Sequence, residues 1–236
     1  MARAKATTLT SEPTDEDGIP DWKQQSVERS LQRARGRAQA RSDRFVAATI
    51  ELMNEGGSTE FTVQDVVDRS RMSIRTFYNF FASKDDLLVA VHQTILAKEV
   101  TPRLRKACDR ESDPIKRVRL YIEAIYDLTS DVTPVYRALT TYSNRLAETR
   151  PQELALAYRP QICLVEELVR DAAASGRLQT RLSVESAAQL LHHTVLSAVH
   201  NRILGSEQGG RITAEELWAF CSSGLGVDPT PTKSTR

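Results

Sequence analysis

The sequence predicts an all-α protein with a small N-terminal helical domain and a larger C-terminal helical domain. From Ser42 onward, apolar residues recur at helical spacing and strand-like alternation is almost absent. Several helix starts are marked by capping pairs, such as Ser83 with Asp86 or Thr213 with Glu216, or by a proline after a capping residue. These signals together predict about nine helices and no sheet.

Length and composition are those of an ordinary globular chain. The chain has 236 residues, of which 40% are hydrophobic and 27% charged, with a net charge of +1. Its three cysteines, Cys108, Cys163 and Cys221, suit neither a disulfide framework nor a zinc site, which indicates a reducing, cytoplasmic setting. We find no apolar run of the ~18 residues that a membrane span needs and no secretory signal. We therefore expect no membrane association, metal or cofactor.

Charge is concentrated near the N-terminus. Residues 10–21 carry five acids and no base, whereas residues 22–44 carry seven bases against two acids. The first 21 residues have the composition of a disordered segment. The basic arm that follows could be a helix or a flexible tail. It could be a solvated charge run, or it could neutralise nucleic-acid phosphates.

Residues 45–81 predict three helices, with a tight turn between the second and the third. Gly56-Gly57 ends the first helix, Thr62 caps the second, and Ser73 caps the third. This is the arrangement of a helix-turn-helix. A long helix is expected from Lys84, kinked or ended by Pro102.

The third of these helices is expected to have an inner and an outer face. Ile74, Phe77 and Phe81 have the spacing of an inward face. The other face is polar, with groups that suit base edges and phosphates in a major groove: Ser73, Arg75, Thr76 and Asn79, with Tyr78 at its edge. Lys84 and Thr62, each at a helix start, could hold phosphates.

The stretch FTVQDVVDRSRMSIRTFYNFFASKDDLL, residues 61–88, resembles the DNA-binding motif of tetracycline-repressor (TetR) family regulators. The shared features are an apolar residue and Thr opening the second helix, a Ser-initiated recognition helix, Phe77-Tyr78, and Ser-Lys-acid-acid-Leu-Leu from Ser83. The match covers about residues 42 to 90. Two positions depart from the pattern, since Arg71 and Arg75 stand where glycine is common.

The two departures have different consequences. A positive φ at Arg71 would cost a non-glycine residue free energy, although its side chain could reach a phosphate. Arg75 could reach guanine O6 and N7, which would give a distinctive operator preference, or it could contact the backbone. The residues expected at DNA are Thr62, Arg71, Ser73, Arg75, Thr76, Tyr78, Asn79 and Lys84, with Arg37 and Arg41 from the basic arm.

The resemblance implies a division of the chain and a way of working. It implies a flexible extension with the basic arm over 1–40, a helix-turn-helix domain over 41–88, an effector-binding and dimerisation domain over 89–226, and a disordered tail over 227–236. The protein would bind a palindromic double-stranded DNA operator as a homodimer. A small, hydrophobic or amphipathic effector would release it, and the basic arm would add DNA affinity.

The helix from Ser183 to Leu204 is apolar nearly all round, which indicates burial on two sides. One side would face its own domain and the other a second copy, although a purely internal helix would show the same pattern. The residues expected at the dimer interface are Leu191, Val195, Val199, Leu217 and Trp218. The histidines of this helix are too poorly placed for a metal site, since His193 and His200 lie about 10 Å apart along the axis.

The expected ligand-binding residues combine apolar surface with a polar group. They are Tyr121, Tyr126, Tyr136, Tyr142 and His192, although residues at this spacing are also typical of plain core. A ligand-independent regulator or an activator of the same fold is the main alternative. A helical enzyme is more remote, since we find no motif of phosphate binding, nucleophilic catalysis or metal catalysis.

Overall fold

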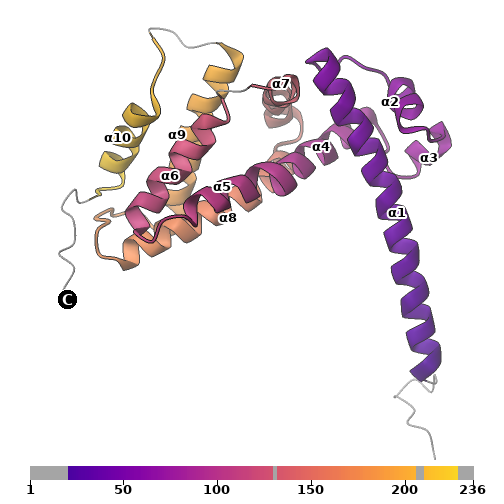
Figure 1. Cartoon of the computed structure of the whole chain (residues 1–236), viewed down its shortest axis with the longest axis horizontal. Helices are drawn as coiled ribbons and strands as arrows, with labels where there is room; N and C mark the ends of the chain where they lie inside the picture. The colour runs from indigo at the N-terminus through magenta and orange to yellow at the C-terminus, as the bar shows by residue number, and fades with distance from the viewer. Residues whose placement is uncertain (1–20, 130–131, 206–209, 228–236) are drawn as a thin grey trace, which may run out of the picture. The chain divides into compact units, whose positions relative to one another are not determined.

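The computed structural model of the chain describes residues 21–129, 132–205 and 210–227 (Figure 1). These residues form ten α-helices and one π-helical segment, and apart from an isolated bridge between Leu178 and Val227 they contain no β-structure. The all-α class is therefore confirmed. The N-terminal residues 1–20 and the tail from 228, both expected to be disordered, lie outside the described residues. The chain divides after Arg44 into two units, which we describe separately.

The first unit holds the basic arm. Helix α1 is Asp21–Gly56, and residues 22–41 of it are almost entirely exposed. Of the two forms that the sequence left open, the arm is thus a helix, and the flexible extension expected to residue 40 is wrong from Asp21 onward. The reason is local, because arginine, glutamine and alanine, which dominate this stretch, are among the strongest helix formers.

The second unit begins at Phe45 and contains the helix-turn-helix. After the last part of α1 come α2 (Val63–Ser70) and α3 (Ile74–Tyr78), and both begin where the sequence predicted. The Thr62 hydroxyl accepts from the Asp65 N–H, and the Asp65 carboxylate accepts from the Thr62 N–H, which forms a complete capping box. The caps therefore fix both ends of the turn that presents α3.

Helix α4 (Lys84–Ile95) continues into α5 (Thr101–Cys108) through a π-helical turn, Leu96–Val100. Pro102 lacks the N–H that would bond to the Lys98 carbonyl in an α-helix, and its ring would clash with that carbonyl. The wider turn removes this conflict, and the Thr101 hydroxyl donates to the Leu96 carbonyl at 2.7 Å. The irregularity expected at Pro102 is thus a π-turn just before it.

The C-terminal bundle consists of α6 (Pro114–Asp127), α7 (Pro134–Thr149), α8 (Pro151–Ala174), α9 (Val184–Leu204) and α10 (Ala214–Gly224). Helix α8 packs against α4, α5, α6, α7 and α9. Ser183, Gly205 and the Thr213–Glu216 capping box mark the ends predicted for α9 and α10.

Helix α8 departs from local sequence signals at its first residue and at an internal proline. Thr149 belongs to the last turn of α7, where its hydroxyl donates to the Arg145 carbonyl, and Pro151 takes the first position of α8. Pro160 lies inside α8 without ending it. Burial of neighbouring side chains such as Gln161 and Leu164 in the bundle outweighs the single hydrogen bond that the proline removes.

Candidate functional site

The turn before α3 places Arg71 in the left-handed region, with φ 55° and ψ 39°. It is the one non-glycine residue with positive φ in the described part of the chain, so the strained backbone predicted at this departure is confirmed. Its N–H bonds to the Asp68 carbonyl at 3.2 Å, and the Met72 N–H bonds to the Val67 carbonyl. The turn closes α2 and sets the direction in which α3 leaves.

Helix α3 presents an exposed outer face. Ser73, Arg75, Tyr78 and Asn79 are exposed, and Tyr78 retains 56% of its accessible surface. The Ser73 hydroxyl caps the Thr76 N–H at 3.1 Å and lies 2.7 Å from the Thr76 hydroxyl. The structure therefore brings together, on one short helix, the side chains that the sequence assigned to base edges.

Ile74 does not face inward, contrary to the sequence prediction. It is 44% exposed, whereas Phe77 is fully buried and Phe81 nearly so. Helix α3 has only five residues, so the expected inward stripe does not continue as a helix, and Phe81 reaches the core from the turn after α3. Ile74 therefore shares the outer face with Tyr78 one turn later, where an apolar side chain can contact a thymine methyl group.

A cluster of phenylalanine rings packs against the inner face of α3. The ring centroids of Phe45 and Phe77 lie 5.5 Å apart in an edge-to-face arrangement, and Phe81 lies 5.6 Å from Phe77 and 6.2 Å from Phe45. Phe80 packs at the margin of the same cluster. Such pairs contribute beyond their buried area, so the aromatic residues concentrated in this stretch fix the recognition helix on α1.

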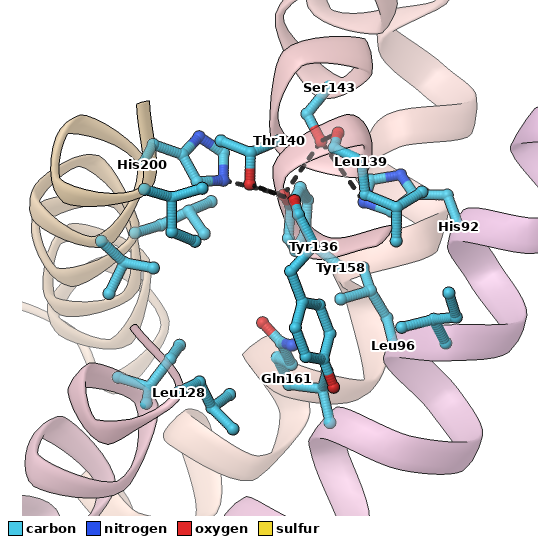
Figure 2. Close-up of a pocket in the computed structure, with 16 residues that line it drawn as sticks. His92, Leu96, Leu128, Tyr136, Leu139, Thr140, Ser143, Tyr158, Gln161 and His200 are labelled. Carbon is cyan, nitrogen blue, oxygen red and sulfur yellow. Dashed lines mark hydrogen bonds between the residues drawn. The ribbon is translucent and has the colours of Figure 1, made fainter. Parts of the chain in front are cut away.

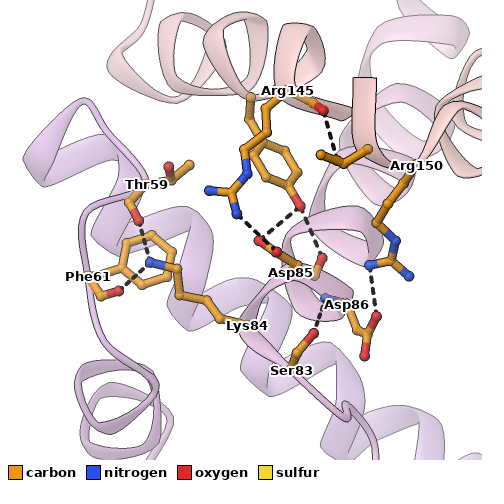
Figure 3. Close-up of polar contacts among 10 residues, drawn as sticks. Thr59, Phe61, Ser83, Lys84, Asp85, Asp86, Arg145 and Arg150 are labelled. Atoms are coloured by element: carbon orange, nitrogen blue, oxygen red, sulfur yellow. Dashed lines mark hydrogen bonds and ion pairs between the residues drawn. The ribbon is translucent and has the colours of Figure 1, made fainter. Parts of the chain in front are cut away.

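The ammonium group of Lys84 is hydrogen-bonded to backbone carbonyls of the protein (Figure 3). Its ammonium donates to the carbonyls of Thr59 and Phe61, each at 2.7 Å, and lies 5.0 Å from the centre of the Phe61 ring. No local pattern in the sequence indicates these bonds, because Thr59 and Phe61 lie 25 and 23 residues away from Lys84. The side chain joins the start of α4 to the loop that enters α2, so a phosphate contact would be additional to this structural role.

The first turn of α4 is also clasped to α7 (Figure 3). The Tyr142 hydroxyl donates to the Asp85 carbonyl at 3.2 Å, Arg145 pairs with the Asp85 carboxylate at 3.3 Å, and Arg150 pairs with Asp86 at 2.8 Å. Burial, and next the nearby Asp85 charge, raise the pKa of Tyr142 to about 12, so its hydroxyl stays a donor. We call these residues the α4–α7 clasp.

A cavity of about 70 Å³ lies within the bundle, bounded by α4, the π-turn, α6, α7, α8 and α9 (Figure 2). Most of its wall is aliphatic: Ile95, Leu96, Val100, Ile125, Leu128, Leu139, Leu196, Val199 and Ile203. Its polar lining consists of His92, Tyr136, Thr140, Ser143, Tyr158, Gln161 and His200. No Asp, Glu, Lys or Arg is among the described residues that line it.

Long hydrogen bonds connect these polar groups (Figure 2). Ser143 Oγ lies 3.3 Å from His92 Nε2 and 3.5 Å from the Tyr158 hydroxyl, which in turn lies 3.4 Å from His200 Nε2. Burial, with a smaller effect of His200, lowers the pKa of His92 to about 4, and burial lowers that of His200. Both imidazoles are therefore neutral near pH 7.

Of the five residues expected to bind a ligand, only Tyr136 lines this cavity. The Tyr121 hydroxyl and His192 Nδ1 lie 3.0 Å apart inside the core. The Tyr126 hydroxyl donates to the Ile212 carbonyl and accepts from Arg202, and Tyr142 belongs to the clasp. The sequence missed His92, Ser143, Tyr158, Gln161 and His200. The available signal was a polar residue within an apolar helical stripe, such as Gln161 three residues before Leu164.

The residues expected at a dimer interface mostly face the protein's own interior. Leu191, Val195, Val199 and Leu217 are buried within the chain, and Trp218 is half-buried. Exposed apolar side chains of the same region are instead Leu190 (56% exposed), Phe220 (69%) and Ile212 (48%). Periodicity alone could not tell which side of α9 packs inside.

Within the described residues, no group of three or more histidine, cysteine or acidic side chains could hold a metal ion. No described helix is long and apolar enough to cross a membrane.

A short helix-turn-helix with an exposed polar recognition face defines the class of protein, which is a DNA-binding regulator. Comparison with known proteins gives the family. The family model for bacterial regulatory proteins of the tetR family matches residues 45–91, from the end of α1 into α4. The helix-turn-helix of this chain is therefore that of TetR-family transcriptional regulators, a non-enzymatic family.

Similarity extends beyond the motif at low identity. The HTH-type transcriptional regulator YvdT of Bacillus subtilis is 19% identical over 187 residues, which cover 78% of this chain and 95% of YvdT. The structure of RolR with resorcinol has a TM-score of 0.65 at 14% identity, covering 81% of this chain and 90% of RolR. Thermus thermophilus FadR, a repressor in complex with lauroyl-CoA, has a TM-score of 0.61 at 18% identity, covering 82% and 99%. These structures share the fold of this chain.

Proposed function

We propose that this regulator is a homodimeric repressor that a small molecule, bound in the bundle cavity, releases from its operator. The observation that carries the proposal is the position of α4. His92, Ile95 and Leu96 of the α4–π-turn segment line the cavity, while Lys84 at its start holds the loop entering α2. The helical segment formed by α4 and the π-turn thus contacts both the proposed effector site and the helix-turn-helix.

The DNA-contacting residues follow from exposure on α3 and at the adjoining helix starts. Arg75, Tyr78 and Asn79 would bond base edges, and Ser73 and Thr76 would do so from the start of the helix. Ile74 would contact a thymine methyl group. Arg71, Thr62 and Lys84 would position the protein on phosphates. Arg75 is the residue whose replacement would change sequence preference most, because an arginine can bond guanine O6 and N7 together.

The exposed side of α9 and α10 is the proposed dimer surface. A groove there is lined by apolar residues of both helices, among them Leu190, Leu191 and Phe220. The exposed part of this groove is the kind of apolar patch that marks an interaction site. A second copy packed on it would give two α3 helices, which on a palindromic operator enter major grooves ~34–36 Å apart.

Effector control would act through the α4–α7 clasp. The cavity of about 70 Å³ is smaller than the ~150 Å³ that a benzene-sized guest occupies in a protein interior, so a ligand must widen it. Widening displaces α4 and α7, both of which line the cavity and meet again at Asp85. A ligand that binds the widened state better lowers the population of the DNA-binding state by its difference in affinity.

The basic arm is proposed to add affinity without sequence preference. Arg29, Arg33, Arg37 and Arg41 are spaced four residues apart on an exposed helix and so form a stripe with one guanidinium per ~6 Å of rise. Such a stripe suits the repeating phosphates of a DNA strand. Replacing all four with glutamine should reduce the slope of log affinity against log salt by about three to four, since each phosphate contact contributes ~0.9.

The relatives support a ligand but do not identify it. RolR has been crystallised with resorcinol and the Thermus thermophilus FadR with lauroyl-CoA, which differ greatly in size and charge. We also propose a cytoplasmic location, a helix-turn-helix domain over 41–88, and an effector-binding and dimerisation domain over 89–226. These proposals accompany the proposed repressor role. A ligand-independent regulator or an activator remains the second candidate, favoured by the small size of the cavity.

The test is capture of sheared genomic DNA on the purified chain at physiological salt, followed by sequencing of the bound fragments. We expect one palindromic motif, and we expect the double replacement Arg75→Ala/Tyr78→Ala to abolish its recovery. Arg159→Ala, an exposed arginine on α8, serves as the matched control and should leave recovery unchanged. DNA with no shared motif, lost steeply as salt rises, would show that only the basic arm binds.

A further inference from the structure

The lining of the bundle cavity restricts the chemistry of its ligand, an inference that rests on the proposed effector role of that cavity. The lining contains no charged side chain, as described above. At its edge, burial and the nearby Glu99 raise the pKa of Tyr136, while Arg103 acts in the opposite direction. The two charges at this edge offset each other, so an anionic ligand finds no net positive charge to compensate its desolvation.

Two buried polar atoms of the cavity lining have no hydrogen-bond partner. Gln161 is 1% exposed and its Oε1 has no hydrogen-bond partner, and Figure 2 shows its side chain pointing into the cavity. His92, 2% exposed, has no partner at Nδ1. A carbonyl oxygen only accepts, so a group that satisfies Gln161 must carry an O–H or N–H donor. Leaving such an atom unpaired costs free energy that a ligand donor would recover.

The remaining polar groups of the cavity make long hydrogen bonds, which a ligand hydroxyl could replace. The Ser143 hydroxyl donates to the Leu139 carbonyl at 2.9 Å, so His92 Nε2–H and the Tyr158 hydroxyl approach Ser143 Oγ as donors. The two contacts between a histidine nitrogen and a hydroxyl oxygen, 3.3 Å at His92 and 3.4 Å at His200, exceed the usual ~2.9–3.0 Å of N–H···O bonds. The 3.5 Å between the Ser143 and Tyr158 hydroxyls exceeds the usual ~2.7–2.8 Å of O–H···O bonds. A ligand oxygen near Tyr158 could therefore accept a better bond than Tyr158 makes now.

We propose that the cavity selects a compact, uncharged ligand with a hydroxyl group that donates to Gln161 and accepts from Tyr158, such as a phenol or a single-ring alcohol. Carboxylates and coenzyme A esters are excluded by charge, and the esters also by size. Hydrocarbons of the same shape are discriminated against because they leave Gln161 Oε1 buried and unpaired.

The experiment is calorimetric titration of the full-length protein with phenol, cyclohexanol, toluene, benzoate and octanoyl-CoA. We expect phenol or cyclohexanol to bind at least about tenfold more tightly than toluene, equivalent to ~1.4 kcal/mol, and benzoate and octanoyl-CoA not to bind. Gln161→Leu should equalise phenol and toluene. Gln152→Leu, an exposed glutamine on the same helix, is the matched control and should keep the preference.

The outcomes separate this inference from the proposed function. Equal or tighter binding of toluene, benzoate or octanoyl-CoA, an intact preference in Gln161→Leu, or no binding by any probe would overturn the ligand class. Release of captured DNA is measured in parallel with the same compounds. Selective phenol or cyclohexanol binding without DNA release would support the ligand class and contradict effector control, whereas release by benzoate or octanoyl-CoA alone would do the reverse.

The stability of the variants gives a second measurement. Because Gln161→Leu removes an unpaired buried oxygen, its urea midpoint without ligand should equal or exceed that of the wild type. A large fall in the midpoint would mean that Gln161 already has a partner within the fold, which would overturn its role as the ligand's acceptor.

Discussion

The aromatic core beneath α3 and the aromatic cluster beside the cavity show two uses of ring packing. Around Phe77 the buried ring neighbours are Phe45 and Phe81, and the exposed Tyr78 lies against its outer side with ring centroids 5.3 Å apart. The described residues of 61–88 leave no buried side-chain polar atom unpaired. Around Tyr158 the neighbours are His92 and His192, each with its ring centroid at 5.5 Å, and both histidines keep a buried nitrogen without a partner.

The difference indicates what each region is for. A dry core of rings has one low-energy arrangement and holds the recognition helix in a fixed place. A cluster with unpaired polar atoms is less stable than its packing permits, and a ligand can recover part of that free energy. On the proposed function, the rigid packing lies where DNA would be read, and the incomplete hydrogen bonding lies where a ligand would bind.

The largest expected effect comes from opening the dry core. Phe77→Ala should lower the free energy of unfolding by about 3–5 kcal/mol, because it leaves a cavity under α3, and DNA binding should be lost with it. Urea unfolding and operator binding measure both. Ile74→Ala, on the exposed side of the same helix, should change stability by less than about 0.5 kcal/mol. Equal losses in the two variants would contradict the assigned faces.

Lys84 tests whether the helix-turn-helix is held by its own polar bonds. Lys84→Ala should lower stability by about 2 kcal/mol, since it removes two charge-assisted bonds to carbonyls that then lack this partner. Lys106→Ala, an exposed lysine on α5, is the control and should be near neutral. If Lys84→Ala kept full stability but lost DNA affinity, a phosphate contact would be its main role.

The histidines of the bundle give a prediction about pH. Burial lowers the pKa of both His92 and His192 to about 4, whereas the unfolded chain binds these protons near pH 6.5. Their contribution to stability is therefore complete above pH 6.5 and is lost as the pH falls toward 4. The slope approaches ~1.4 kcal/mol per pH unit for each histidine.

Urea unfolding between pH 7 and pH 5 measures this slope, above the range in which carboxylates titrate. His92→Leu should remove the contribution of one histidine from this slope. A slope that does not respond to His92→Leu would show that this imidazole is not held neutral by the fold.

The smallest expected effect concerns the strained turn. Arg71→Gly should be more stable than Arg71→Ala by about 1 kcal/mol, because glycine adopts positive φ without the steric cost of a Cβ. Both variants lack the guanidinium, so they should lose DNA affinity equally if Arg71 contacts a phosphate. A more stable Arg71→Ala would contradict the strain at this turn.

The features that depend on contacts within four residues can be predicted from the sequence. The caps at Thr62, Ser73 and Ser83 and the glycine end of α9 were all predictable, because each bond joins atoms close together in the chain. The family motif of residues 61–88 is likewise visible in the sequence, because its residues lie in one continuous stretch. It established the class of protein before any tertiary contact was known.

Which side chains meet across the bundle depends instead on tertiary packing. His92 and Ser143 are 51 residues apart, and Lys84 and Thr59 are 25 apart, so no periodicity relates them. The outward Ile74, the inward Leu191 and the uninterrupted Pro160 were also set by packing, which outweighs local preference when a neighbour supplies or withholds buried surface. The recognition helix is a local structure, whereas the cavity exists only because six segments of the chain enclose it.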